Sequence, residues 1–489
     1  MEKQLVVMKF GGTSVGNAER VRQCAEIVRR GAERYQVIVV VSAMAGVTDL
    51  IFRTIDAARQ GDAAATEANL KKFGLVHREL MLDLFAGEQL APALEFAGQI
   101  YEQLSRASQA LLTLRTDISA QTMDSLVALG ERITSWALAA YLEQTGCPGK
   151  FVKAEDVIVT DATFGNASPE METTTQRCKD VLSPVLAGGA VPVIGGYSGA
   201  TVDNRTTTLG RGGSDYSATI VGAAMKADEI WIWTDVDGVL SADPRICSDA
   251  TILPDISFAE AIELAYYGAK VIHPRAAYPA QDAGIPVWIK NSFRPEVAGT
   301  RITNHAGSST SPVKSVTCVK QATLITLVTR RDIHPAELWG RLFLRLGQEQ
   351  VEVLFATQSS PEHALGLVLR REDGDRVVKL INSIFRMELA QGVLLPVEVD
   401  GNIAVIAVLG ESMKGTCGIL GRVFSAVARK DVSVIAVAQG ASELSICFAV
   451  EAKAANEVVK SIHDEFCAPA NNNIPVCLRP TASSVAGQQ

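Results

Sequence analysis

The first residues suited to act on a substrate lie near the amino terminus, where an apolar run ends in paired glycines. Lys9 stands at the end of that run, and Gly11 and Gly12 follow it. Glycines let backbone N–H groups approach phosphate oxygens, and the lysine adds a full positive charge. Apolar residues spaced three or four apart over 18–28 then predict an amphipathic helix. We therefore expect a strand, a tight turn and a helix start that can bind an anion. The alternative is an ordinary turn with a solvated lysine.

A second glycine-rich stretch, residues 209–215, also lies between a polar turn and a helical pattern. Gly212 and Gly213 stand at its centre, with Arg211 before them and Asp215 after them. A repeated glycine turn of this kind favours the phosphate interpretation over the solvated lysine. Asp215 could instead simply cap its helix.

One carboxylate stands among apolar neighbours inside a helical pattern that covers 125–142. This residue, Glu131, could be aimed at a substrate ammonium group. The alternative is a surface salt bridge, which would contribute little to stability.

Four apolar runs of strand length must position these side chains, at residues 5–8, 37–41, 191–194 and 230–233. Each run ends in a loop of glycine, hydroxyl or charged residues. In an open α/β sheet, ligands bind outside the carboxyl ends of the strands, so the four loops are candidates for one shared site. The segment from Leu50 to about Thr113 predicts several helices beside this sheet. A helix is expected over 258–271 and a last strand over 285–290.

The carboxy-terminal part of the chain contains an internal repeat. Residues 324–385 and 403–466 both follow the order βαββα, and a final strand is expected at Val476. The two copies align at the tetrapeptides 340–343 and 421–424. We therefore predict a ferredoxin-like module used twice, with two unrelated α+β segments as the alternative.

Composition limits the classes of protein that the chain can represent. Its 489 residues, 47% hydrophobic and 20% charged, suffice for two or three cored domains. A net charge of −8 gives no reason to expect a nucleic acid or an anionic membrane as partner. No apolar stretch approaches the ~18 residues of a membrane span, and no signal-peptide pattern is present, so we expect a cytoplasmic protein. The nine cysteines include no C-x-x-C pair and are interpreted as buried reduced thiols, neither zinc ligands nor disulfides.

Four motifs occur in a specific order, at residues 9–14, 206–215, 234–238 and 267–274. They resemble the signature stretches of aspartokinases, which have the amino acid kinase fold, and the repeat resembles the paired ACT domains of that family. The resemblance implies an α/β catalytic domain, an open sheet sandwiched by helices, followed by two ferredoxin-like βαββαβ ACT modules. The expected boundaries are 1–305 for the catalytic domain, 306–315 for a linker, 316–398 and 399–480 for the ACT domains, and 481–489 for a tail.

The resemblance implies transfer of the γ-phosphoryl group of ATP, with Mg²⁺, to the side-chain carboxylate of L-aspartate. The product would be 4-phospho-L-aspartate, on the way to lysine, threonine and methionine. A carboxylate acceptor is already anionic, so such an enzyme needs positioning and charge neutralisation and no strong base. The alternatives are another amino acid kinase, acting on glutamate, N-acetylglutamate or UMP, and an ACT-based amino acid sensor with weak kinase activity. The chain could also be half of a fusion with homoserine dehydrogenase.

The resemblance also implies roles for single residues. Lys9 would bind the transferring phosphoryl group, and Asp215 would steer it or help to hold Mg²⁺. Glu131 would bind the ammonium of aspartate and Arg211 its α-carboxylate. Ser42 and Thr48 are expected near the amino acid. The residues assigned to ATP are Gly11, Gly12, Gly212, Gly213, Thr234, Asp235, Arg245 and Lys270, although Arg245 could instead close a surface turn.

At two positions the chain departs from the family pattern, one expected to affect ATP binding and the other effector binding. Leu240 stands where relatives commonly have a tyrosine near the nucleotide, so affinity for ATP is expected to differ. In the first ACT copy, Glu337 occupies the place of a glycine that the second copy keeps as Gly418. An effector, lysine or threonine, is therefore expected to bind the second loop in preference to the first. Pairing of ACT modules predicts a homodimer or a larger oligomer.

Overall fold

The computed structural model describes residues 3–269, 271–307, 311–330, 335–359 and 363–467. The chain forms two compact units. Unit 1 consists of Met1–Val239, Pro254–Phe258 and Val271–Ala306, and unit 2 of Leu240–Leu253, Ala259–Lys270 and Gly307–Gln489. Lys270, the strand expected at Val476 and the tail 481–489 lie outside the described residues.

Unit 1 is built on an eight-stranded sheet in the order β3-β4-β2-β1-β7-β9-β10-β8. All neighbouring strands are parallel except β9 and β10. The strands are β1 (Leu5–Phe10), β2 (Gln36–Val41), β3 (Gly149–Val152), β4 (Val191–Gly195), β7 (Glu229–Thr234), β8 (Asp255–Ser257), β9 (Val287–Asn291) and β10 (Thr300–Thr303). A separate hairpin pairs β5 (Ser198–Ala200) with β6 (Thr206–Thr208). The four runs that we expected to share one ligand edge are the neighbouring strands β4, β2, β1 and β7.

Helices cover both faces of this sheet, as expected for a parallel sheet of apolar strands. Successive side chains of β1 point to opposite faces of the sheet. Met8 contacts α1 on one face, whereas Val7 lies near α8 on the other. The helices on the sheet are α1 (Ala18–Arg34), α6 (Leu129–Gln144), α7 (Met171–Ala187) and α8 (Gly213–Met225). Of the other two helices, α10 (Pro274–Ala283) packs on α8, and α5 (Ala120–Val127) contacts β6, α2 and α6. Short 3-10 turns are η1 (Gly12–Val15), η2 (Gly87–Gln89) and η3 (Ala154–Asp156).

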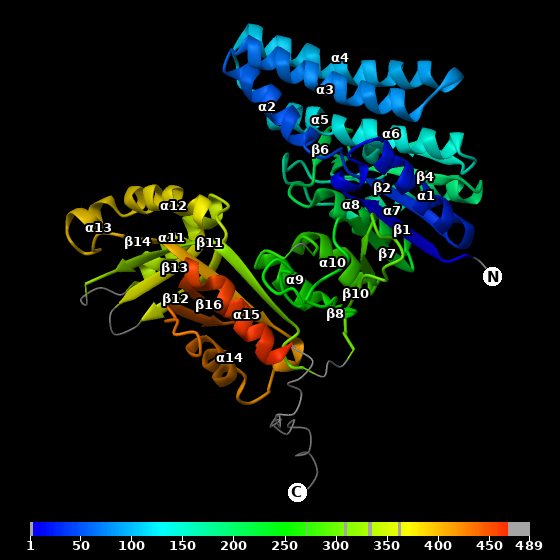
Figure 1. The fold of residues 1–489 in the computed structure, drawn as a ribbon. Coiled ribbons are helices and arrows are strands. Elements are labelled where there is room, and N and C mark those ends of the chain that lie inside the picture. The colour runs from blue at the N-terminus through cyan, green and yellow to red at the C-terminus, as the bar shows by residue number, and fades with distance from the viewer. Residues whose placement is uncertain (1–2, 270, 308–310, 331–334, 360–362, 468–489) are drawn as a thin grey trace, which may run out of the picture. The chain divides into compact units, whose positions relative to one another are not determined.

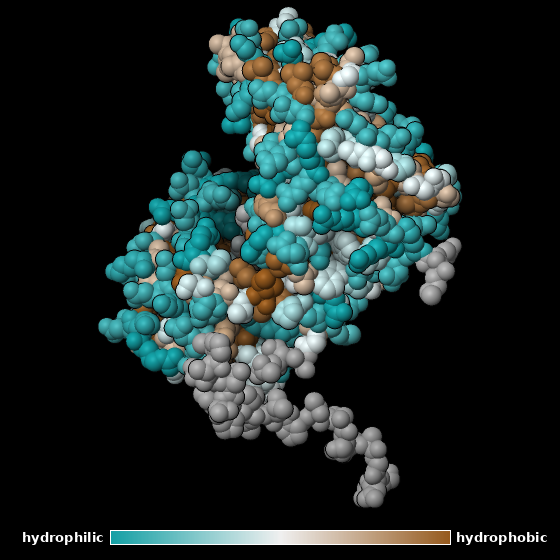
Figure 2. Space-filling model, turned by 45° about the vertical axis from the view of Figure 1, so that its right-hand side comes forward, coloured by the Kyte–Doolittle hydropathy of each residue, from teal (hydrophilic) through white to brown (hydrophobic). Residues whose placement is uncertain are grey.

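The helical segment expected after β2 consists of α2 (Val47–Arg59), α3 (Ala63–Leu84) and α4 (Leu90–Leu114), which pack on one another (Figure 1). Hydrophobic side chains gather on the surface over α3 and α4 (Figure 2). Leu75 and Leu82 of α3 are among the exposed large hydrophobic residues. Among the described helices, none is both long and apolar enough for a membrane span.

Unit 2 contains one six-stranded antiparallel sheet in the order β12-β13-β11-β14-β16-β15. The two copies of the predicted repeat share this sheet, because the long strand β11 pairs with β13 of the first copy and with β14 of the second. The strands are β11 (Ser315–Val328), β12 (Val353–Ser359), β13 (Ala364–Arg370), β14 (Glu398–Leu409), β15 (Ala436–Gln439) and β16 (Ser445–Glu451). The helices are α9 (Phe258–Tyr266), α11 (Pro335–Gln348), α12 (Arg371–Ile384), α13 (Arg386–Ala390), α14 (Ile419–Ala428) and α15 (Ala455–Phe466), with short turns η4 (Glu411–Met413) and η5 (Ala452–Ala454). The expected fold class is confirmed for both parts.

Three local expectations differ from the structure. The helix predicted over 258–271 ends at Tyr266, because Gly268 adopts a φ of 91°, which helical residues do not. The strand at β9 is not the last in unit 1, since β10 follows it. Cys417 is exposed, whereas we expected buried thiols; the eight cysteines within the described residues are all free.

Candidate active site

A lysine and an aspartate from the two glycine-rich stretches meet at the carboxyl end of β1. Lys9 shares its face of the strand with Val7, the face that α8 covers, and Asp215 lies in the first turn of α8. The Nζ atom of Lys9 is 2.5 Å from Oδ1 of Asp215, and both side chains are largely buried. Asp215 does not cap its helix, since the N-cap is Gly212, with a φ of 72° and no side-chain hydrogen bond. The aspartate is thus held by the lysine and not by its own backbone.

The loop after β2 forms a second wall and depends on a glycine in the turn after β1. The N–H of Ala45 donates to the carbonyl of Gly12 at 3.1 Å. A Cβ atom at position 12 would stand 2.8 Å from the carbonyl oxygen of Ala43, too close for any other residue without a backbone shift. In this loop, Ser42 directly follows β2, and Thr48 lies in the first turn of α2.

Glu131 lies in the first turn of α6 and is buried, with an exposed fraction of 4%. Burial raises its pKa to about 7, although N–H groups of Ala43 and of Glu131 itself donate to the carboxylate. Its Oε2 atom has no hydrogen-bond partner among the described residues. An unsatisfied carboxylate oxygen in a buried position is suited to receive a cationic group from a ligand.

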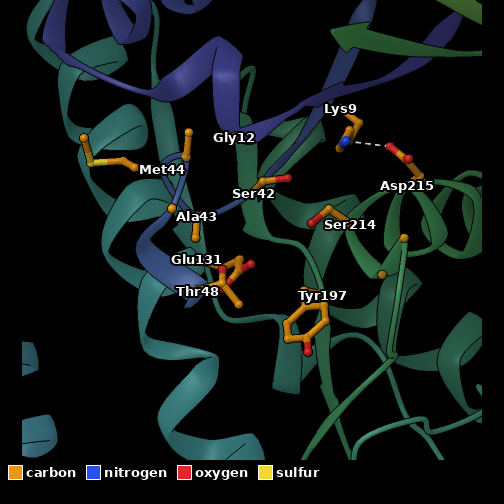
Figure 3. Close-up of a pocket in the computed structure, with 14 residues that line it drawn as sticks. Lys9, Gly12, Ser42, Ala43, Met44, Thr48, Glu131, Tyr197, Ser214 and Asp215 are labelled. Carbon is orange, nitrogen blue, oxygen red and sulfur yellow. Dashed lines mark ion pairs between the residues drawn. The ribbon is translucent and has the colours of Figure 1, made fainter. Parts of the chain in front are cut away.

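These side chains surround one cavity of about 340 Å³. Lys9 and Asp215 lie together at one end of it, while Glu131 and Thr48 lie toward the other (Figure 3). The lining residues are Lys9, Gly12, Ser42, Ala43, Met44, Ala45, Gly46, Thr48, Glu131, Tyr197, Gly212, Gly213, Ser214 and Asp215. The cavity therefore has an ion pair at one end and, toward the other, a buried carboxyl group with an oxygen left for a cationic group of a ligand.

Other residues expected at the site do not line this cavity. Arg211 is exposed, although the adjoining Gly212 lines the cavity. Thr234 and Asp235 end β7 without reaching the lining; the hydroxyl of Thr234 donates to the carboxylate of Asp235 at 3.3 Å. Arg245 belongs to unit 2 and pairs with Asp243 at 2.7 Å. Arg245 and Asp243 thus stand in one surface turn, and a contact of Arg245 with a nucleotide stays a prediction.

Gly11 also stands outside the lining, but its N–H donates to the carbonyl of Trp233 at 3.1 Å. That bond ties the turn after β1 to β7. Lys270 lies outside the described residues.

Two further residues, Tyr197 and Asp124, help to build the site, although the sequence analysis gave them no role. Tyr197 lines the cavity after β4 in a left-handed conformation, with φ of 69°, and burial raises the pKa of its phenol. Asp124 is buried behind the second glycine stretch and accepts hydrogen bonds from the N–H groups of Gly165 and Thr208, both at 2.8 Å. The aromatic residue directly after two glycines was the available signal for Tyr197. Nothing local in the sequence distinguishes Asp124, because its partners are far away in the chain.

A conserved-family profile described as the amino acid kinase family matches residues 4–291, more than half of the chain. A profile described as an ACT domain matches residues 406–466. Together with the parallel sheet and the lysine–aspartate pair, these matches define the class as an amino acid kinase with a carboxy-terminal ACT region.

Similarity to individual proteins narrows this assignment within the amino acid kinases. Lysine-sensitive aspartokinase 3 of Escherichia coli is 30% identical over 94% of this chain and 98% of its own. The crystal structure of E. coli aspartokinase III in complex with aspartate and ADP has a TM-score of 0.78 and 29% identity, covering 94% of this chain and 99% of that one. The chain spans about half the length of other relatives, such as bifunctional aspartokinase/homoserine dehydrogenase 2 of Arabidopsis thaliana, which is 32% identical over 94% of this chain and 50% of its own. The chain belongs to the amino acid kinase family, among its aspartokinases.

Proposed function

We propose that the protein transfers the γ-phosphoryl group of ATP to the side-chain carboxylate of L-aspartate and so forms 4-phospho-L-aspartate. The observation that carries this proposal is the cavity in which a buried lysine–aspartate pair faces a buried carboxylate with an unpaired oxygen. The relative whose structure contains aspartate and ADP matches nearly the whole chain, which supports the same reaction.

The charges in the cavity fit the ends of the two substrates. The Oε2 atom of Glu131 would receive the ammonium of aspartate, while Ser42 and Thr48 hold the amino acid from the loop after β2. Lys9 would neutralise charge on the transferring phosphoryl group, at the point where it develops. Arg211 is exposed beside the cavity and would close on the α-carboxylate, where a guanidinium can pair bidentately.

ATP and Mg²⁺ would occupy the end of the cavity near Asp215. A carboxylate beside glycine-rich backbone suits Mg²⁺, which binds one or two carboxylates together with substrate phosphates. Asp215 has one oxygen on Lys9, which leaves the other for such an ion. Backbone N–H groups at the start of α8, beside Gly212 and Gly213, would donate to phosphate oxygens. The assignments of Thr234, Asp235, Arg245 and Lys270 to the nucleotide stay predictions from the family resemblance.

Regulation by an amino acid would reach the catalytic unit through α9. This helix belongs to unit 2, although β8 before it and His273 after it belong to unit 1. Its Glu260 is 2.8 Å from Lys314, and its Glu263 accepts a hydrogen bond from Ser445 of β16 at 3.0 Å. On the unit 1 side, the His273 side chain stands directly against Gly212 of the cavity lining. A shift of the ACT sheet would therefore pull on a segment that continues into the active-site wall.

Lysine is the first effector to test, because one relative is named as lysine-sensitive and a solved relative contains lysine and aspartate. Threonine stays the alternative. We also propose at least a homodimer, through the ACT modules, and a cytoplasmic location; both rest on the sequence pattern and the family resemblance.

The test is trapping of the acyl phosphate with hydroxylamine, using the purified protein with ATP and Mg²⁺. Hydroxamate should form from L-aspartate and not from glutamate; ADP release should show no turnover with N-acetylglutamate or UMP. Lysine, threonine and methionine are then added singly and together. Turnover of another acceptor in preference to aspartate would contradict the proposed substrate. Effector binding without any hydroxamate would indicate the amino acid sensor instead.

A further inference from the structure

A histidine in unit 2 is completely buried and has one nitrogen unpaired. His463 lies on α15 and has an exposed fraction of 0%. Its Nε2 atom is 2.9 Å from the hydroxyl oxygen of Ser241, which also accepts the N–H of Thr251 at 3.0 Å. Its Nδ1 atom has no hydrogen-bond partner among the described residues. A buried polar nitrogen left without a partner is destabilising, so its presence here calls for a ligand.

Two carboxylates stand on the side toward which this nitrogen points. Oδ1 of Asp249 is 3.9 Å from Nδ1 of His463, beyond hydrogen-bond distance. Asp464, the next residue on α15, brings a second carboxylate, and one oxygen from each aspartate lies within 4.8 Å of the other and of a ring nitrogen of His463. Both aspartates are exposed, so a small ion can reach them from solvent.

The hydroxyl behind the imidazole allows the tautomer that a cation needs. The oxygen of Ser241 has two lone pairs, one for the Thr251 N–H and one for a proton on Nε2 of His463. With the proton on Nε2, the lone pair of Nδ1 is directed at the carboxylates. Ligating histidines characteristically donate their second ring N–H to an oxygen in this way.

We propose that Asp249, His463 and Asp464 bind a divalent first-row transition-metal ion, of which Zn²⁺ is the representative, with water completing the coordination. Zinc binds imidazole nitrogen and carboxylate oxygen at about 2.0–2.2 Å in tetrahedral geometry, so two ligand atoms on one ion are about 3.3–3.6 Å apart. The ligand atoms of the three residues lie within 4.8 Å of one another, so rotation of the two exposed aspartate side chains would have to bring them up to about 1.5 Å closer. The nitrogen ligand favours such ions over Mg²⁺ and Ca²⁺, which prefer oxygen.

The ion would join two separate parts of the chain. Asp249 comes from the segment 240–253, which interrupts unit 1 in the sequence and belongs to unit 2, whereas His463 and Asp464 come from α15. Asp464 already has an interaction partner in the protein, and the ion must compete with that partner for the carboxylate. The site would therefore fasten this segment to the ACT module, and none of its three residues lines the catalytic cavity.

The test uses the full chain, stripped of metal with EDTA and dialysed, and titrates ZnCl₂ in a calorimeter. We expect one Zn²⁺ per chain, and at least tenfold weaker binding for Asp249→Asn and for Asp464→Asn. Asp375→Asn, an exposed aspartate on α12, is the matched control and should bind as the wild type does. MgCl₂ should give no comparable binding.

His463→Gln could fail to fold, so the imidazole is tested by spectroscopy on the native sequence. Co²⁺ added to the stripped wild type should give visible d–d absorption that Zn²⁺ displaces, and this band should be lost in Asp249→Asn. Absence of Zn²⁺ binding by the wild type overturns the proposal. Binding that the two aspartate substitutions leave unchanged overturns it equally.

Discussion

Two buried lysine–carboxylate pairs, one in each unit, have nearly the same chemistry and different surroundings. Lys9 and Asp215 of unit 1 are 2.5 Å apart, with side-chain exposures of 10% and 19%. Lys314 and Glu260 of unit 2 are 2.8 Å apart, with exposures of 8% and 2%. Burial of an ion pair therefore does not by itself distinguish a reactive site from a structural one.

The two pairs differ in whether carboxylate oxygens at or near them lack hydrogen-bond partners. The second oxygen of Glu260 accepts the N–H of Glu411 at 2.7 Å, so that carboxylate is bonded through both oxygens. The pair in unit 1 instead lines an open cavity that also contains Glu131, whose Oε2 has no partner within the described part of the chain. Unsatisfied polar groups around a cavity, more than the ion pair itself, indicate where a ligand binds.

The largest effect is expected on stability, from Lys314→Met. Removing one partner leaves the Glu260 charge buried and unpaired, which should cost about 3–5 kcal/mol of unfolding free energy in urea titrations. The turnover of protein that remains folded should stay near that of the wild type. The double variant Lys314→Met/Glu260→Met is the control, because removing both charges should recover much of the loss. Equal stability of the single and double variants would contradict a structural role for this pair.

Lys9→Met is the counterpart in unit 1 and should act on turnover. Removing a positive charge that faces the transferring phosphoryl group should lower kcat by about 100-fold or more. The loss of stability should be smaller than for Lys314→Met, since the cavity lets water reach Asp215. Lys179→Met, an exposed lysine on α7, controls for the general loss of a charge. Near-normal kcat in a steady-state assay would return Lys9 to the role of a structural ion pair.

Arg211→Ala tests whether the exposed arginine beside the cavity completes the substrate site. A charge-assisted bond to the α-carboxylate contributes about 1.5–3 kcal/mol, so KM for aspartate should rise roughly 10- to 100-fold. KM for ATP should change little. Titration of both substrates measures the two constants, and an effect confined to ATP would refute the assignment.

Much of this site could be predicted from the sequence because its residues lie in short local motifs. Lys9 and Asp215 each stand beside glycines at the end of a strand or the start of a helix, and their meeting follows from the parallel sheet. Tyr197 and Asp124 were missed because left-handed backbone and distant hydrogen bonds leave no local pattern. The membership of α9 in unit 2 was missed for the same reason: its partners Lys314 and Ser445 lie far along the chain.

Glu131 gives a smaller effect that depends on pH. Burial raises its pKa to about 7, so below pH 7 the carboxyl is increasingly neutral and attracts an ammonium less. KM for aspartate should therefore fall as pH rises toward 7, by up to tenfold per unit, and then level off. Glu131→Gln should have a high KM without this dependence, measured from pH 5.5 to 8.5. A pH-independent KM in the wild type would contradict the proposed contact.

The Glu131 carboxyl group also makes the free energy of unfolding depend on pH. Between its usual pKa of 4.5 and about 7, the folded protein holds a proton that the unfolded chain has released. Stability from this group is therefore greatest at low pH and decreases as pH rises through that window. Glu131→Gln should remove this decrease in urea titrations.

The smallest effect concerns the two ACT copies, which differ at the start of one helix. Gly418 precedes α14 with a φ of 85°, and a Cβ there would meet no atom within 4 Å. The corresponding residue of the first copy, Glu337, is exposed in the first turn of α11, after a loop at 331–334 that lies outside the described residues. The second loop already accommodates a carboxylate, since the N–H of Gly415 donates to Glu443 at 3.0 Å.

We therefore expect Gly418→Glu to weaken inhibition by lysine or threonine a few-fold, through like-charge repulsion of the effector carboxylate. Glu337→Gly should create or strengthen inhibition at the first copy. Gly418→Ala is the control, because it imposes the backbone strain of a side chain at positive φ without a charge. Inhibition curves for the three variants, with light scattering to follow the oligomer, separate charge from strain. If the wild type is tightly inhibited and Gly418→Glu leaves that inhibition unchanged, the effector binds elsewhere and the second loop is not the competent one.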